Sequence, residues 1–314
     1  MVILNDVIWA QKYRPKKISE CVLPTRLKAT LQKLVDERDV PHMLFVGSSG
    51  VGKTTAARAM VEEIGADYIV INASLHGNID TLRTDIQCYC SSVSLTGGRK
   101  YIILDESDYL TPLTQPALRS FMEEFSQNAS FILTANYRDR IIPALQSRCA
   151  VIDFKPTKAE SKKLASEFLK KLHEILHAEG VQYEVAAVAE VIVRYYPDWR
   201  RVLNELQAYS KETGRIDSGV LARARTNVDE LWGYLRDRDF TGCRRWIGVN
   251  LDGDSSGLVR ALYDRASDLM TPQSVPQLVL ILAKYQDMAA RVVDQEINTA
   301  AMCVEIMIDT EFKK

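Results

Sequence analysis

Apolar and polar residues follow two different patterns along the chain, and the change between them comes near Pro156. Before it, short apolar runs alternate with stretches of helical spacing, which is typical of buried parallel strands joined by helices. After it, apolar residues recur at intervals of three and four, which predicts helices. The predicted strands are 43–46, 68–71, 101–104, 131–135 and 151–154.

Helix positions follow from the same spacing together with capping and helix-breaking residues. The spacing predicts helices over 26–40, 79–91, 114–124 and 185–195. Pro197 stops the last of these, and Asp198 is a good N-cap for the helix that follows. Near the start of the chain, Pro15 holds Arg14 extended, so we expect the segment from Trp9 to be a strap rather than a helix.

The loop after the first strand has the pattern of a phosphate-binding loop. Residues 47–54 read GSSGVGKT and match G-x-x-x-x-G-K-[ST] between a strand and a helix. Glycines let backbone N–H groups point at anionic oxygens, and the helix dipole adds to the attraction. Lys53 would reach the β- and γ-phosphates, and the Thr54 hydroxyl could ligate Mg²⁺. The alternative is a Gly/Ser turn with a surface lysine.

Polar residues at two other strand ends supply further groups for such a site. Asp105 and Glu106 follow the third strand, where a carboxylate could hold Mg²⁺ and another could polarise an attacking water. Asn136 ends the fourth strand and would lie beside the γ-phosphate if that strand lies between the first and the third. Without these neighbours, the acids would be a solvated turn and Asn136 a turn former.

Composition narrows the class of protein. The chain has 314 residues, enough for two or three domains, and its 40 basic side chains nearly balance its 41 acidic ones. Any nucleic-acid contact must therefore come from a local patch. No apolar run has the length of a membrane span, and the start lacks a signal-peptide pattern. The six scattered cysteines indicate neither a disulfide framework nor a zinc ribbon, and a reduced, cytosolic setting is expected.

One motif in the second half points to different chemistry. His173, Glu174 and His177 match H-E-x-x-H, and Gly180 fits the extended pattern of a zinc peptidase. The position of the third metal ligand in that pattern is Tyr183, however, and a catalytic zinc needs three protein ligands. The expected alternative is a charged helix whose histidines flank its apolar stripe.

Taken together, residues 47–54, Asp105–Glu106, Asn136 and the triplet Ser147–Arg148–Cys149 resemble the AAA+ ATPase module of clamp loaders of the replication factor C family. The stretches 11–15, 20–24 and 196–200 are most similar to the large subunits of clamp loaders from T-even-type bacteriophages. The resemblance covers nearly the whole chain. It implies an α/β AAA+ P-loop domain with a parallel five-stranded sheet flanked by helices (1–156), a helical lid (157–226) and an all-α collar (227–314).

The resemblance also implies a role for each site residue. ATP would lie between lid and core, with Mg²⁺ on Thr54 and Asp105. Glu106 would activate water, Arg148 would act in trans as an arginine finger, and Arg200 would contact the γ-phosphate from the lid. The phosphates would be held by Gly50, Val51, Gly52, Lys53, Thr54 and Thr55, and the adenine would lie against Gln11, Lys12, Tyr13 and Val22.

The partners implied are a homo-oligomer of large subunits with a small subunit, a ring-shaped sliding clamp and primer–template DNA, in the cytoplasm of a host cell if the chain is phage-encoded. A loader must accept any sequence, so DNA contacts should be to backbone phosphates, with Arg83 as the candidate. Asn78 lies where relatives carry a basic switch residue. The helix 114–124, with Leu118, Phe121 and Met122, would either face the clamp or pack ordinarily.

Three other functions remain open at this point. One is a different AAA+ DNA machine, either a branch-migration motor or a replication initiator. Another is a scaffold with a degenerate site, against which Lys53, Asp105 and Glu106 argue. The last is the zinc peptidase suggested by His173 and His177.

Overall fold

The computed structural model describes residues 7–74, 79–94, 97–111, 114–251, 256–289, 291–292 and 294–313. Contacts within the chain group it into two units, Met1–Asp217 and Ser218–Lys314. The predicted boundary between residues 226 and 227 falls inside helix α10 (Gly219–Arg236), so the division into lid and collar stays a prediction. In the described part of the chain, none of the helices combines the length and apolarity that crossing a bilayer requires.

A five-stranded sheet forms the centre of the first unit, as the sequence predicted. Its order is β2-β3-β4-β1-β5, and all neighbouring strands are parallel. Because β4 lies between β1 and β3, the condition under which Asn136 would reach the phosphate loop is met. The strands are β1 (Met43–Val46), β2 (Tyr68–Asn72), β3 (Lys100–Asp105), β4 (Ala129–Ala135) and β5 (Ala150–Asp153).

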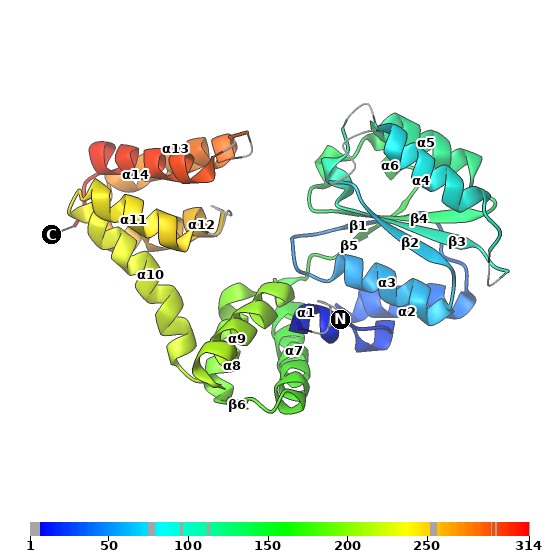
Figure 1. Ribbon diagram of the computed structural model, residues 1–314, viewed down its shortest axis with the longest axis horizontal. Helices are drawn as coiled ribbons and strands as arrows, with labels where there is room; N and C mark the ends of the chain where they lie inside the picture. The colour runs from blue at the N-terminus through cyan, green and yellow to red at the C-terminus, as the bar shows by residue number, and fades with distance from the viewer. Residues whose placement is uncertain are drawn as a thin grey trace. The chain divides into compact units, whose positions relative to one another are not determined.

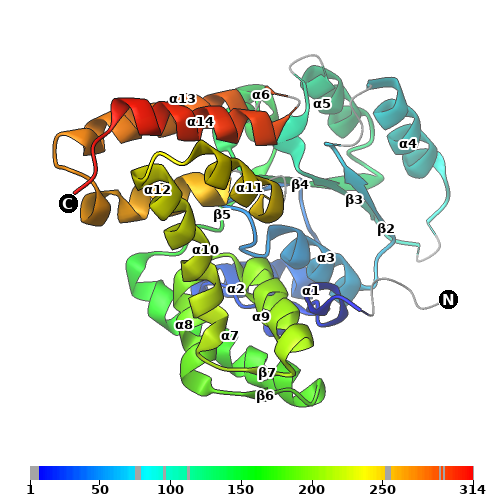
Figure 2. The same ribbon diagram turned by 60° about the vertical axis from the view of Figure 1, so that its left-hand side comes forward.

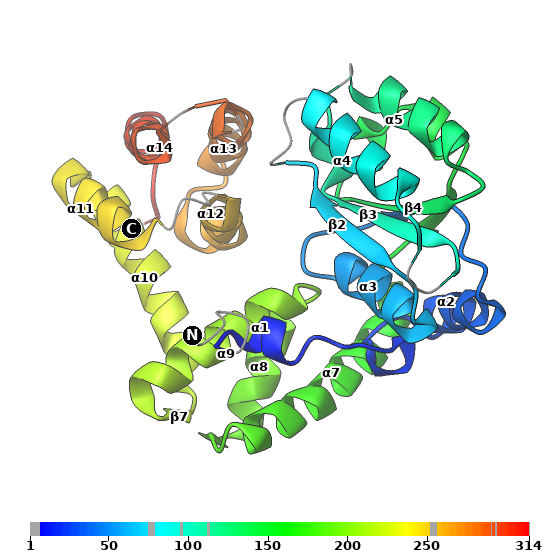
Figure 3. The ribbon, with the colours of Figure 1, turned by 45° about the vertical axis from the view of Figure 1, so that its right-hand side comes forward.

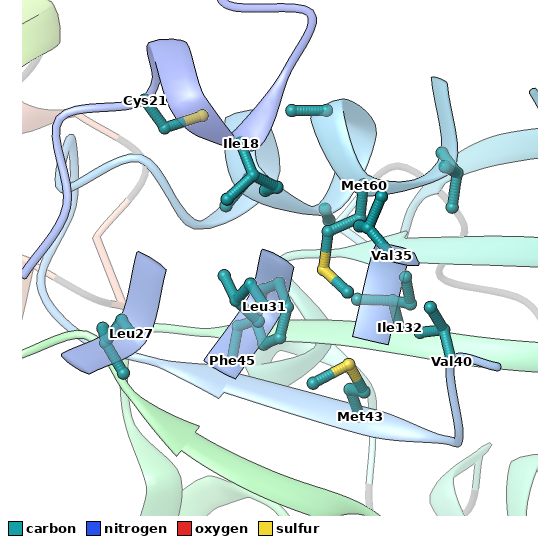
Figure 4. Packing of buried hydrophobic residues seen from close by; sticks show 14 of the residues in the cluster. Ile18, Cys21, Leu27, Leu31, Val35, Val40, Met43, Phe45, Met60 and Ile132 are labelled. Atoms are coloured by element: carbon teal, nitrogen blue, oxygen red, sulfur yellow. The ribbon is translucent and has the colours of Figure 1, made fainter. Parts of the chain in front are cut away.

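Helices cover both faces of this sheet (Figure 1). Helices α2 (Thr25–Glu37) and α3 (Lys53–Ile64) lie on one face, and α4 (Ile79–Ser91) and α5 (Thr114–Glu124) lie on the other. Burial on both faces explains why the strands are continuous apolar runs. Figure 4 shows side chains of α2, β1 and α3 that pack together on the first face, among them Leu31, Phe45 and Met60.

Two sequence predictions about helix extent are wrong. The helix predicted to reach residue 40 ends at Glu37, because Arg38 adopts a left-handed conformation (φ 53°) and its N–H bonds the Val35 carbonyl. The expected strap contains one helical turn, α1 (Trp9–Lys12). Pro15 restricts only Arg14, so it leaves the residues before it free to form that turn. The chain then continues through a 3-10 turn, η2 (Ile18–Glu20).

Three helices complete the first unit after β5. They are α7 (Lys158–Ala178), α8 (Val185–Tyr195) and α9 (Trp199–Thr213), with a two-stranded sheet of β6 (Gln182–Tyr183) and β7 (Arg215–Ile216) beside them (Figure 2). Thr157 and Glu160 form a reciprocal capping box at the start of α7. Asp198 caps α9 by accepting from the Arg201 N–H at 3.0 Å, as predicted.

Three short helical segments follow strands β3 and β4. The first, η3 (Ser107–Tyr109), comes between β3 and α5, whereas η4 (Arg138–Arg140) and α6 (Pro143–Gln146) come between β4 and β5. The second unit is helical, with α10 followed by α11 (Phe240–Asn250), α12 (Ser256–Leu269), α13 (Ser274–Ala289) and α14 (Gln295–Asp309). These helices enclose an apolar core of their own, which includes Trp246, Leu262 and Ile306.

Candidate functional site

A cavity of about 460 Å³ lies in the first unit and is lined by residues from the loop after β1, the carboxyl ends of β3 and β4, helices α7 and α9, and the N-terminal segment. A volume of this size is typical of small-molecule sites. Lys12 and Val51 do not line it. The sequence-predicted residues that do are Gln11, Tyr13, Val22, Gly50, Gly52, Lys53, Thr54, Thr55, Asp105, Glu106, Asn136 and Arg200.

The loop after β1 needs its glycines for both backbone shape and space. Gly50 (φ 72°) and Gly52 (φ 95°) adopt left-handed conformations, and α3 begins directly afterwards. A Cβ on Gly50 would lie 1.8 Å from Asp198 Oδ1. The Trp199 N–H also donates to the Gly50 carbonyl at 3.2 Å. The start of α9 therefore packs directly on the loop, and only glycine allows that approach.

Lys53 lies at the base of the loop with only 8% of its surface exposed. Its ammonium donates to the carbonyls of Gly47 (2.7 Å) and Ser48 (2.8 Å) and to Asn136 Oδ1 (2.9 Å). Burial lowers its pKa to about 8, although the carboxylates of Asp108 and Asp105 act in the opposite direction. A cation that is held among acceptors and only partly paired by acids is well suited to bind a phosphate.

Thr54, Asp105 and Thr134 form a connected network at the carboxyl edge of the sheet. The hydroxyls of Thr54 and Thr134 each donate to Asp105 Oδ1 at 2.6 Å. This arrangement holds the carboxylate against the first turn of α3, next to the phosphate-binding loop. Oxygen ligands of this kind are those that Mg²⁺ prefers, so Thr54 and Asp105 could hold one.

Glu106 is positioned by an unusual backbone conformation. It adopts φ 56° and ψ 42°, a left-handed conformation rare for a residue with a side chain, and its N–H donates to Thr134 Oγ1 at 3.1 Å. The strand ends here, and the side chain lines the cavity. Strained residues of this kind cluster at functional sites, where surrounding contacts hold them in place.

The structure distinguishes the two neighbouring arginines at the start of α9. Arg200 lines the cavity, whereas the Arg201 guanidinium lies 4.7 Å from the Tyr195 ring centroid. Arg14, whose role the sequence did not suggest, also lines the cavity; its pKa is lowered by burial and by the positive charges of Arg58 and Arg200. Arginine charge therefore gathers beside a loop shaped for anions.

Arg148 is not among the residues that line this cavity. Its guanidinium donates to Glu123 Oε1 of α5 and to the Ala144 carbonyl, the latter at 2.9 Å. About a third of the side chain remains exposed. The chain thus holds this arginine away from its own candidate site, on a partly exposed surface.

Of the residues proposed for DNA and clamp contacts, those that the structure describes are not among the residues that line the cavity. Arg83 is exposed on α4, and its guanidinium lies 5.9 Å from the Phe121 ring centroid. Asn78 lies outside the described residues. Of the two alternatives for α5, the side chains follow ordinary packing, because Leu118, Phe121 and Met122 are buried in the apolar core on that face of the sheet.

The histidine motif lies on α7. The ring of His173 packs against that of Tyr183, with centroids 5.3 Å apart, so the position of the expected third ligand is filled by an aromatic contact. Within the described residues, no three His, Cys, Asp or Glu side chains group in a way that could hold a metal ion.

Sequence reasoning missed several residues that line the cavity. Thr134 could have been found, because it lies two positions before Asn136 and therefore on the same face of its strand. The apolar lid residues Phe168, Ile175 and Leu203 carried no such signal, since their spacing was that of an ordinary apolar helix stripe. The missed residues include Asn72, Thr134, Phe168, Lys171, Ile175, Trp199, Leu203 and Asn204.

Two family descriptions match the chain between residues 43 and 222, nearly all of which lies in the first unit. Residues 43–157 match the ATPase family associated with various cellular activities (AAA), and residues 160–222 match the sliding-clamp-loader large subunit, AAA+ ATPase lid domain. Together these matches cover the phosphate-binding loop, the sheet and the helices that close the cavity.

Full-length relatives agree with both matches. The chain is 32% identical to the sliding-clamp-loader large subunit of Enterobacteria phage T4 and 31% identical to that of Escherichia phage RB69, with 100% of each chain covered. It is 30% identical to the replication factor C small subunit of Methanothermobacter thermautotrophicus, over 95% of this chain and 88% of that one. Among solved structures, a RuvB variant of Thermotoga maritima shares the fold, with a TM-score of 0.55 at 18% identity over 82% of this chain and 93% of that one.

Proposed function

The chain belongs to the clamp-loader family of AAA+ ATPases, and we propose that it is the ATP-hydrolysing large subunit of a sliding-clamp loader. The proposed cycle is that ATP binding opens the clamp for loading onto primer–template DNA, and hydrolysis triggers release. The observation that carries the proposal is the cavity in which Lys53, Asp105 and Glu106 meet beneath a lid that matches the clamp-loader family. A degenerate scaffold would not need this complete set of catalytic groups.

We propose that the phosphates of ATP lie on the loop 47–54, where Lys53 and the start of α3 supply positive charge. Glu106 is the general base that takes a proton from the attacking water, and Asn136 orients that water. Arg200 reaches the γ-phosphate from α9. Because α9 packs on Gly50, loss of the γ-phosphate would loosen the contact between the lid and the loop.

Magnesium fits the residues present. The Thr54 hydroxyl and the Asp105 carboxylate already lie 2.6 Å apart at the edge of the loop, and these two groups would hold the ion. Once bound, Mg²⁺ would neutralise charge on the phosphates during transfer.

Arg148 would complete the site of a neighbouring copy rather than its own. This proposal is supported by its position outside its own cavity and by its partly exposed surface. The active form would then be an assembly of large subunits with a small subunit, in which ATP lies between neighbours. DNA would be held through backbone phosphates, with Arg83 on α4 as one contact. Such an assembly would act in the cytoplasm, which is that of a host cell if the chain is phage-encoded.

The proposed function is tested by steady-state ATP turnover of the assembled loader. We expect the rate to rise when the sliding clamp and primed DNA are added together, above the rate with either alone. Unprimed duplex DNA is the control, because a translocating motor would respond to it without a clamp. Turnover that ignores the clamp would contradict the proposal.

The pKa of Lys53 predicts how ATP affinity depends on pH. In the nucleotide-free protein this pKa is lowered to about 8. Only the protonated amine binds phosphate as a cation, so affinity should fall as the pH rises through 8, by up to about tenfold for each pH unit. Calorimetric titration with ATP between about pH 7 and pH 9.5 measures this. Lys53→Arg keeps its charge over this pH range, so its ATP affinity should depend less on pH. If the affinity of this variant fell with pH as steeply as that of the wild type, the pH dependence could not be assigned to Lys53.

A further inference from the structure

The N-terminal segment 7–14 is attached to the lid helices, although these lie far away in the sequence. The Trp9 N–H donates to Gln207 Oε1 at 3.0 Å, and Gln207 Nε2 donates to the Val7 carbonyl at 2.6 Å. Gln207 is only 7% exposed. A buried amide with both ends used in this way holds the backbone at one place and in one orientation.

A second attachment is made by Glu179, at the end of α7. Lys12 Nζ and the Tyr13 hydroxyl each donate to Glu179 Oε1 at 2.6 Å. The Glu179 side chain is 21% exposed. Burial acts to raise its pKa, but hydrogen bonds from Lys12, Tyr13 and the Trp9 side chain lower it. The carboxylate is therefore held charged by the segment that it anchors.

These two anchors continue the cavity-lining faces of their helices. On α7, Phe168, Lys171 and Ile175 line the cavity, and Glu179 follows at the next turn of the same face. On α9, Leu203 and Asn204 line it, and Gln207 follows likewise. The segment therefore crosses both lid helices one turn beyond their own cavity-lining residues; Figure 3 shows α1 beside α9.

The segment passes from lid to core over a few residues. Its last hydrogen bond to the lid is made by Tyr13, and the Ile18 N–H then donates to Glu63 Oε2 of α3, in the core, at 2.8 Å. Ile18 itself is fully buried against the sheet. Gln11 and Tyr13 line the cavity, and the segment that contains them is thus held by the lid. Pro15 and its neighbours connect this segment to the core.

We propose that Glu179 and Gln207 are positioning residues for the base end of the nucleotide. The inference rests on the proposed function, because it requires ATP in this cavity. The loop 47–54 takes the phosphates, so we place the base against the N-terminal part of the cavity lining, which includes Gln11, Tyr13 and Val22. Without the two anchors, that wall is in place only part of the time, and the apparent affinity falls by that fraction.

The test compares two ligands of the purified full chain in calorimetric titrations with Mg²⁺. ATP uses both ends of the cavity, whereas inorganic tripolyphosphate uses only the loop. Glu179→Ala and Gln207→Leu should each weaken ATP binding by about tenfold or more and leave tripolyphosphate binding unchanged. Glu190→Ala, on an exposed position of α8, is the matched control. Tyr13→Phe removes a single hydroxyl and should also weaken ATP binding, by a smaller factor than the anchor variants.

Several outcomes would overturn the proposal. One is unchanged ATP affinity in anchor variants that keep the unfolding temperature of the wild type. Another is an equal loss for ATP and tripolyphosphate, which would mean that the anchors support the whole cavity. If the anchor variants do not fold, Tyr13→Phe tests the proposal through the same comparison of ATP binding with tripolyphosphate binding. Failure of the proposed function would look different, because the wild-type chain would then not bind ATP or its assembly would ignore the clamp.

Discussion

ATP binding is expected to be lost when Lys53 is replaced by alanine. The ammonium is buried, and its three acceptors hold it at the base of the loop, where the phosphates would arrive. Each hydrogen bond to a charged group contributes a net of about 1.5–3 kcal/mol, so two bonds from the Lys53 ammonium to the phosphates would contribute about 3–6 kcal/mol to binding. That corresponds to a loss of affinity of about 10²–10⁴-fold, measured by calorimetric titration with ATP and Mg²⁺.

The control for this variant must separate lost charge from a collapsed loop. Lys28→Ala removes a lysine whose ammonium donates to the Ser19 carbonyl at an exposed position, and it should bind ATP normally. The unfolding temperature of nucleotide-free Lys53→Ala should stay near that of the wild type, because the fold loses a cation whose burial already lowers its pKa. Near-normal ATP affinity in Lys53→Ala would contradict the assignment of the phosphate site.

Replacement of Arg148 by alanine is expected to separate binding from turnover. The side chain lies outside its own cavity and is held by Glu123, so the isolated variant should bind ATP as the wild type does. In the assembly, each site would lack the guanidinium from its neighbour, and turnover with clamp and primed DNA should fall by about 10³–10⁵-fold. Arg99→Ala, next to the start of β3 at the edge of the sheet opposite the cavity, is the control and should turn over normally.

Mixed assemblies would show on which chain Arg148 acts. Lys53→Ala subunits cannot bind ATP but keep Arg148, whereas Arg148→Ala subunits bind ATP but lack the arginine. Where the two meet in the right order, a complete site forms, and part of the turnover should return. If Arg148 acts within its own chain, no mixture of the two variants restores turnover.

The sequence determined the parallel sheet, its flanking helices and the glycine-rich loop 47–54 that leads into α3. These features depend on local causes: apolar runs between helical spacings, glycines before Lys53, and a capping aspartate at 198. The position of Asn136 needed one further condition, that β4 lie between β1 and β3, and pairing between distant strands is a tertiary property.

The tertiary structure alone decided which side chains meet across the cavity. Arg200 and Arg201 are neighbours in a helical turn, and only the packing of α9 on Gly50 directs the first to the cavity and leaves the second against Tyr195. Lys12, expected at the adenine, instead pairs with Glu179 of the lid. Such contacts join residues far apart in the chain, and no local spacing records them, because hydrogen bonds and charges act through space rather than along the sequence.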